Sequence, residues 1–133
     1  MSGTVYVVQQ VVKRDPATGD LVPRWDLGPA ERFGKLVYLL GPRAQPGTPE
    51  SILGDLRHGL RAYDDEDFIL PIGDPCFIGW AIAIAADVNS KVACLRWDGV
   101  RRDYQVIIAD VFPIDDELLE PSGYGKNGTY HTS

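Results

Sequence analysis

Residues 67–97 read Asp67-Phe-Ile-Leu-Pro-Ile-Gly-Asp-Pro-Cys-Phe-Ile-Gly-Trp-Ala-Ile-Ala-Ile-Ala-Ala-Asp-Val-Asn-Ser-Lys-Val-Ala-Cys-Leu-Arg-Trp97, and this stretch decides the fold. Its apolar run at residues 68–72 is rich in branched side chains, which is typical of a buried strand. Asp74 and Pro75 predict a helix start, because Asp is a favoured N-cap and Pro suits the first helical position. Residues 92–97 return as a strand, so the stretch predicts a strand–helix–strand unit.

The predicted helix is apolar on every side, since residues 76–86 contain no charged residue. Such a helix must be covered all round by the rest of the protein. It is too short for a membrane span, which needs roughly 20 apolar residues. We therefore expect a buried core helix and no membrane contact.

Residues 4–12 and 21–25 predict an N-terminal β-hairpin. The first run is rich in β-branched residues, and the segment between the two runs contains the turn dipeptides Asp15-Pro16 and Thr18-Gly19. Pro23 cannot donate a ladder hydrogen bond, so we expect the second strand of the hairpin at an edge.

An amphipathic helix follows a further strand at residues 35–40. Thr48 is a suitable N-cap for this helix, and Pro49 is a suitable first residue. Its apolar residues recur at helical spacing and should face the sheet. They are Ile52, Leu53, Leu56, Leu60 and Tyr63.

Asp98-Gly99 is the strongest hairpin dipeptide in the chain. It predicts a C-terminal β-hairpin that joins residues 92–97 to a strand at residues 103–111. Residues 113–133 form a tail that is first acidic and then rich in Gly, Ser and Tyr. A tail of this composition is normally disordered unless it docks onto a partner or onto another copy of the chain.

These elements predict one compact α/β (or α+β) domain over residues 1–112, followed by the tail over residues 113–133. The strands around the two helices should be parallel, with residues 68–72 near the middle of the sheet. The N-terminal and C-terminal hairpins should add antiparallel strands, which makes the sheet mixed. The second helix should be buried.

The 133 residues have a net charge of -6 at pH 7, which argues against direct, sequence-independent binding of nucleic acid. The two cysteines, Cys76 and Cys94, lie in apolar runs and are expected to be buried free thiols in a reducing cytosol.

Motifs for chemistry are missing. His58 and His131 have no neighbours at the spacing of a metal site or a catalytic triad. The acidic run at residues 64–67 fits a solvated connection better than a divalent-cation site, because it lacks spaced ligands. We therefore expect no catalytic residue, no metal and no cofactor, which favours a non-enzymatic role without excluding an enzyme.

The C-terminal hairpin is the best candidate for a protein-recognition surface, because Trp and Arg dominate interface hot spots. The candidate protein-binding residues belong to this hairpin and to the tail: Arg96, Trp97, Arg101, Arg102, Leu118, Leu119 and Tyr124. The alternative for Trp97 is that it packs across the hairpin against Tyr104.

A small-ligand site is expected, if there is one, at the carboxyl ends of the parallel strands. The residues at those ends are Gly41, Gly73, Asp74 and Asp98. Asp74 would repel a phosphate from the start of the second helix, so the turn does not favour nucleotide binding. Asp74 is far more often a plain N-cap than a catalytic base.

Five segments of the chain resemble a group of small proteins of unassigned function that tailed bacteriophages encode. These segments are Val5-Tyr6-Val7-Val8-Gln9, Asp15-Pro16-Ala17-Thr18-Gly19, Val22-Pro23-Arg24-Trp25-Asp26-Leu27, and Ile69-Leu70-Pro71-Ile72-Gly73-Asp74-Pro75 with the following Ile82-Ala83-Ile84-Ala85-Ala86-Asp87. The resemblance extends to about residue 105 and excludes the tail. It implies a phage product but transfers no functional residue.

Three functions follow as hypotheses. The first is a non-enzymatic module that binds a host or phage protein in the host cytoplasm. The second is a minor virion component that docks through its tail, with self-association possible in either case. The third is a small-ligand-binding protein or enzyme with a site at the carboxyl ends of the parallel strands.

Overall fold

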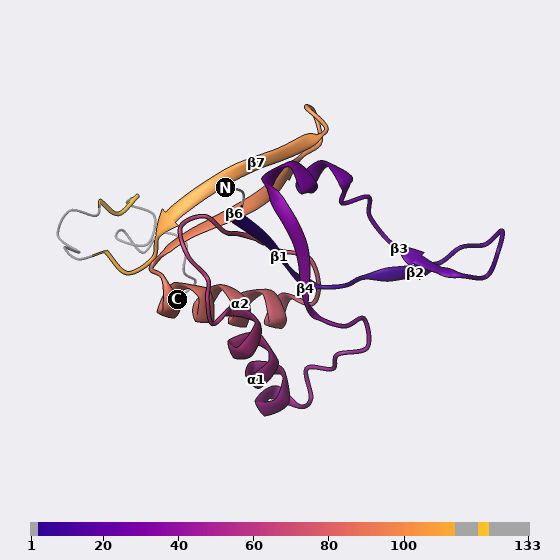
Figure 1. Cartoon of the computed structure of the whole chain (residues 1–133), viewed down its shortest axis with the longest axis horizontal. Coiled ribbons are helices and arrows are strands. Elements are labelled where there is room, and N and C mark those ends of the chain that lie inside the picture. Colours follow the sequence, from indigo (N-terminus) through magenta and orange to yellow (C-terminus); the bar gives the residue numbers. More distant parts are fainter. Residues whose placement is uncertain (1–2, 114–119, 123–133) are drawn as a thin grey trace, which may run out of the picture.

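The structure, a computed structural model, describes residues 3–113 and 120–122 (Figure 1). Its strands are β1 (Gly3–Gln9), β2 (Val12–Arg14), β3 (Leu21–Pro23), β4 (Gly34–Leu40), β5 (Phe68–Leu70), β6 (Lys91–Asp98) and β7 (Asp103–Asp110). Its helices are the 3-10 helix η1 (Gly28–Phe33) and the α-helices α1 (Pro49–Leu60) and α2 (Pro75–Val88).

The main sheet has five strands in the order β4-β1-β5-β6-β7. The first four strands are parallel to one another, and β7 pairs with β6 in the antiparallel sense. The predicted α/β class, the parallel centre and the C-terminal hairpin are therefore confirmed. The short strand β5 is the middle strand, as expected from its apolar sequence.

The N-terminal hairpin differs from the prediction. Residues 4–12 do not form one strand: β1 pairs with β4 and β5 inside the main sheet, whereas β2 and β3 form a separate two-stranded sheet. Figure 1 shows this hairpin projecting from the body of the protein. Burial explains the split, because Val5, Val7 and Val8 are fully buried whereas Lys13 and Arg14 are exposed.

The two faces of the main sheet are covered by different elements. On one face, α1 and α2 pack over a core that includes Tyr6, Val8 and Ile69 (Figure 1). On the other face, residues such as Val5 and Leu95 pack with η1 and the segment before it. The predicted amphipathic helix is confirmed by α1, which buries Ile52, Leu56 and Leu60 and exposes its charged side.

Helix α2 begins as predicted but is not covered on all sides. The carboxylate of Asp74 accepts a hydrogen bond of 2.8 Å from the Cys76 amide, and Pro75 is the first helical residue. Phe77 and the alanines on the inner face are buried, but Cys76 and Ala83 are exposed. The expectation of a fully buried helix is wrong because α1 and the sheet reach only one side of α2.

The two thiols therefore lie in different environments. Cys76 is exposed, which corrects the expectation of two buried cysteines, and Cys94 is half-buried. Burial raises the pKa of the Cys94 thiol, which keeps it protonated at neutral pH.

The acidic run at residues 64–67 stabilises the backbone. The carboxylate of Asp67, which is buried, accepts hydrogen bonds from the amides of Thr4 and Asp64, at 2.8 Å and 3.0 Å. The Asp64 carboxylate in turn accepts one from the Glu66 amide at 2.9 Å. Within the described residues, no group of three potential metal ligands comes together.

The turn between β5 and α2 depends on Gly73 and Gln9. Gly73 has a φ of +129°, and a Cβ atom there would lie 2.5 Å from the Cβ of Gln9. The buried side chain of Gln9 accepts a hydrogen bond of 2.9 Å from the Asp74 amide and donates one of 3.2 Å to the Gly41 carbonyl. This side chain therefore links the carboxyl ends of β4 and β5 through the end of β1.

The substitution Gly73→Ala should lower the free energy of unfolding by about 1–3 kcal/mol, because only glycine adopts this backbone conformation without strain. Gly54→Ala is the matched control, since a Cβ at this site in α1 meets nothing within 4 Å. It should raise that free energy by about 0.5–1 kcal/mol. Chemical denaturation measures both values, and equal effects of the two substitutions would contradict this account of the turn.

Candidate functional site: an aromatic pocket beside β5 and β6

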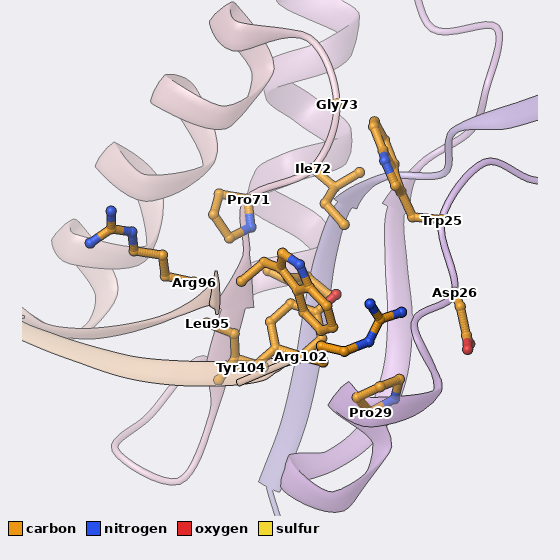
Figure 2. A pocket seen from close by; sticks show the side chains of 12 residues that line it. Trp25, Asp26, Pro29, Pro71, Ile72, Gly73, Leu95, Arg96, Arg102 and Tyr104 are labelled. Carbon is orange, nitrogen blue, oxygen red and sulfur yellow. The ribbon is translucent and has the colours of Figure 1, made fainter. Parts of the chain in front are cut away.

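A pocket of about 760 Å³ opens at the carboxyl ends of β5 and β6, on the face of the sheet opposite α1 and α2 (Figure 2). Its lining is mainly apolar, with Leu70, Ile72 and Leu95 contributed by β5, the residues after it and β6. Trp25 and Asp26, from the segment between β3 and η1, line it as well. Three segments that are distant in the sequence therefore build one cavity.

The β6–β7 hairpin contributes an aromatic pair to the pocket. Trp97 and Tyr104 are opposite each other in the strand register, and their ring centroids lie 5.1 Å apart in an edge-to-face arrangement. The packing alternative for Trp97 is thus confirmed. Trp97 is nevertheless 47% exposed and lines the pocket, so the same side chain packs on the hairpin and offers surface to a ligand.

The segment that contains Trp25 is fixed by local contacts. Trp25 is half-exposed, and the guanidinium of Arg24 lies 5.2 Å from its ring centroid. The Asp26 carboxylate accepts a hydrogen bond of 2.9 Å from the amide of Gly28, the first residue of η1. An ion pair of 2.7 Å between Arg32 and Asp103 then joins η1 to the first residue of β7.

Among the titratable side chains that line the pocket, Tyr104 has a clearly shifted pKa. Burial raises its pKa above the ordinary value of 10.0, and the negative charge of Asp26 acts in the same direction. The phenol is therefore neutral at physiological pH, and a neutral phenol can donate a hydrogen bond.

Arg102 holds an unusual backbone conformation at the pocket. Its φ of 55° is the only positive φ outside glycine among the described residues. A side chain in this left-handed region costs roughly 1–2 kcal/mol, and glycine would avoid that cost. Figure 2 shows the guanidinium extending toward the side of the pocket that has Trp25 and Asp26.

The predicted site residues separate into two groups. Four of them line the pocket: Gly73, Arg96, Trp97 and Arg102. Figure 2 shows the guanidinium of Arg96 pointing away from Tyr104 and the other labelled side chains of the pocket. The guanidinium of Arg96 is therefore not the part of this residue that lines the pocket.

The other predicted residues have structural roles or lie elsewhere. The Asp98 carboxylate accepts hydrogen bonds from the amides of Val100 and Arg101, at 3.0 Å and 3.2 Å, and forms a loose ion pair with the exposed Arg101 side chain. Asp74 caps α2, and the Gly41 carbonyl bonds to Gln9. Leu118, Leu119 and Tyr124 lie outside the described residues.

Sequence reasoning missed the contribution of Trp25, Asp26 and Pro29. Trp25 and Asp26 lie in the segment 22–27, which is one of the segments that resemble the phage proteins. That resemblance was the one sequence signal that could have indicated their importance. Their place in the site depends on η1 folding back over the sheet, and no local pattern predicts that contact.

The side chains that line the pocket define the contacts that it can make. An apolar cavity with aromatic side chains, one guanidinium and one carboxylate offers no nucleophile with an adjacent base. It does offer apolar contact, aromatic stacking and one strong cationic hydrogen-bond donor.

Arg102→Gly should leave the free energy of unfolding unchanged or raise it by about 1 kcal/mol, because glycine removes the left-handed strain. Arg101→Gly is the matched control in the same turn, at a residue without a positive φ. It should lower that free energy by up to about 1 kcal/mol. Denaturation curves that show Arg102→Gly as the more damaging substitution would contradict the assignment of strain.

Comparison with known proteins gives a family match. A family model described as Phage Pam3 gp32-like protein matches residues 3–111, which includes every element of the fold. No curated protein and no solved structure matches the chain. Among the described helices, none has the length and apolar character that a membrane span requires.

Proposed function

Since the chain belongs to the Phage Pam3 gp32-like protein family, we propose that it is a phage-encoded protein-binding module acting in the host cytoplasm. The pocket beside β5 and β6 receives one large apolar or aromatic side chain of a partner protein. The observation that supports this best is the open aromatic rim: Trp25 and Trp97, both at the pocket, are 49% and 47% exposed.

The exposed rim favours a protein partner over an enclosed ligand. Small-molecule sites usually bury more than about 70% of the ligand surface, which two half-exposed tryptophans do not achieve by themselves. Exposed Trp with a neighbouring Arg is the composition of interface hot spots. A partner surface would complete the enclosure and exclude water from around the inserted side chain.

Arg102 specifies the chemistry beside the inserted side chain. Its guanidinium can form paired hydrogen bonds with a carboxylate, which are stronger than bonds between neutral groups. The partner segment therefore combines an aromatic or large apolar residue with an adjacent Asp or Glu. The net charge of -6 supports a protein over a nucleic acid as the partner.

A photo-reactive amino acid at Val100 tests the proposal in infected cells. Val100 is 94% exposed in the same turn as Arg102. We expect irradiation to give one adduct of defined mass, and its partner peptide to contain an aromatic or large apolar residue beside a carboxylate. The same probe in purified virions distinguishes action in the host cytoplasm from a place in the particle.

The matched control places the probe at Val88, an exposed valine at the end of α2. This site should not give the adduct. Arg102→Gly should abolish the adduct at Val100 while the fold remains intact. An adduct formed equally at both valines, or one that persists in the Arg102→Gly variant, would rule out the pocket as the binding site.

The pocket volume supports a second candidate, a small-ligand-binding protein. About 760 Å³ falls within the usual range of small-molecule sites, which is roughly 300–1,000 Å³. An aromatic carboxylate such as indole-3-propionate matches the rings and Arg102. At a concentration of 100 times its dissociation constant, such a ligand should stabilise the protein by about 2.7 kcal/mol in a thermal-shift assay. Absence of a shift, or an unchanged shift in the Arg102→Gly variant, would exclude this candidate.

A further inference from the structure

Strand β7 is an edge strand without the usual protection against pairing. Figure 1 shows it along the outer side of the sheet, and its residues pair continuously with β6 without a bulge. Between Asp103 and Asp110 it contains neither a charged residue nor a proline. Natural edge strands usually carry Lys, Pro or a bulge that blocks a second strand.

The apolar side chains at the centre of β7 are exposed. Val106, Ile107 and Ile108 are 37%, 42% and 58% exposed, and adjacent residues of a strand point to opposite faces of the sheet. We refer to these three residues as the β7 triad. A second strand placed beside β7 would cover the triad on both faces at once.

Hydrogen bonding identifies the backbone groups that are available. The Val111 amide donates to the Ser90 carbonyl at 2.8 Å, in the same register as the β6–β7 ladder. Bonded and non-bonded pairs alternate along an antiparallel ladder. The amide and carbonyl groups of Val106 and Ile108 therefore point away from β6, toward the free side of the sheet.

The start of the strand is already occupied. The Tyr104 amide donates to the Asp103 carboxylate at 2.8 Å, and Arg32 donates to the Tyr104 carbonyl at 3.5 Å. The open part of the edge thus begins after Tyr104 and is centred on the β7 triad.

We propose that a second copy of the chain covers this edge, with β7 pairing to β7 in the antiparallel sense about a two-fold axis. The two five-stranded sheets then become one continuous sheet. This inference goes beyond the proposed function, because the edge of β7 and the pocket are separate surfaces.

The sequence of β7 permits a self-complementary antiparallel register. When Ile107 lies opposite Ile107 of the second copy, Val106 lies opposite Ile108, and their outward backbone groups exchange hydrogen bonds. The triad then pairs only with itself. Asp110 faces Tyr104, so no two carboxylates are opposed. A shift by one residue would place Asp103 opposite Asp110. It would also place the outward-pointing backbone groups of one copy opposite residues of the other copy whose backbone groups already bond to β6.

Light scattering on the full-length protein tests the association. We expect a molar mass twice the 14.7 kDa of one chain. Ile107→Lys should reduce the mass to that of one chain without loss of secondary structure, because an exposed edge lysine is how natural sheets block pairing. Val100→Lys, at another exposed valine, should leave the doubled mass unchanged. A full-length protein that is a monomer overturns the proposal and leaves the edge to the tail or to a different protein.

Cysteine cross-linking tests the register. The background needs Cys76→Ser and Cys94→Ala, because Cys94 lies opposite Ile107 on β6 and would compete for the new thiol. Ile107→Cys should form a disulfide between copies under mild oxidation, since Cα atoms of a non-hydrogen-bonded pair lie about 4.5 Å apart.

Ile108→Cys is the matched control for this register. Although Ile108 is more exposed, its thiols would lie on a diagonal of about 7–8 Å between Cα atoms and should cross-link far less. Equal cross-linking at both positions would overturn the register. Arg102→Gly should leave the dimer intact, which separates a failure of this proposal from a failure of the proposed function.

Discussion

A parallel sheet must be covered on both faces, and this requirement explains most of the structure. The described part of the chain has two α-helices, and both pack on the same face of the sheet. The opposite face is left to a 3-10 helix of six residues and to the segment before it. That cover does not close over the carboxyl ends of β5 and β6, and its residues Trp25, Asp26 and Pro29 form one wall of the pocket that opens there. The candidate binding site is therefore the part of the sheet that η1 leaves open.

The crevice that α/β sheets usually offer to ligands is occupied here. The end of β1 lies between the ends of β4 and β5, and Gln9 fills this position with its own side chain. The bonds of Gln9 to Gly41 and Asp74 make the crevice a structural joint. The candidate site is shifted toward β6, where Trp97 and Arg102 extend beyond the core. The joint and the candidate site share Gly73, whereas the strained Arg102 belongs to the candidate site alone.

The β6–β7 hairpin links the pocket to the exposed edge of β7. Its turn contributes Arg102 to the pocket, and its outer strand exposes the β7 triad along the edge. The Arg32–Asp103 ion pair holds the start of β7 against η1 and so fixes both surfaces relative to the core. With half-exposed charges it contributes little energy, on the order of 1 kcal/mol or less, and its role is to position the hairpin. The partner proposed for the pocket and the second copy proposed for the edge would both contact this hairpin.

The sequence by itself determined the elements whose signals are local. Asp74-Pro75 specifies the start of α2, and the apolar residues 68–70 specify a middle strand, because capping and burial act within a few residues. Asp98-Gly99 locates the C-terminal hairpin, but the turn is held by the Asp98 carboxylate, and its positive φ lies at Arg102 instead of Gly99. Only the tertiary structure decided that β1 pairs with β4 and β5 inside the main sheet, that α2 keeps one exposed side, and that Trp25 and Trp97 line one pocket. Those outcomes depend on which distant segments compete to cover the same apolar surface, and a local pattern contains no information about that competition.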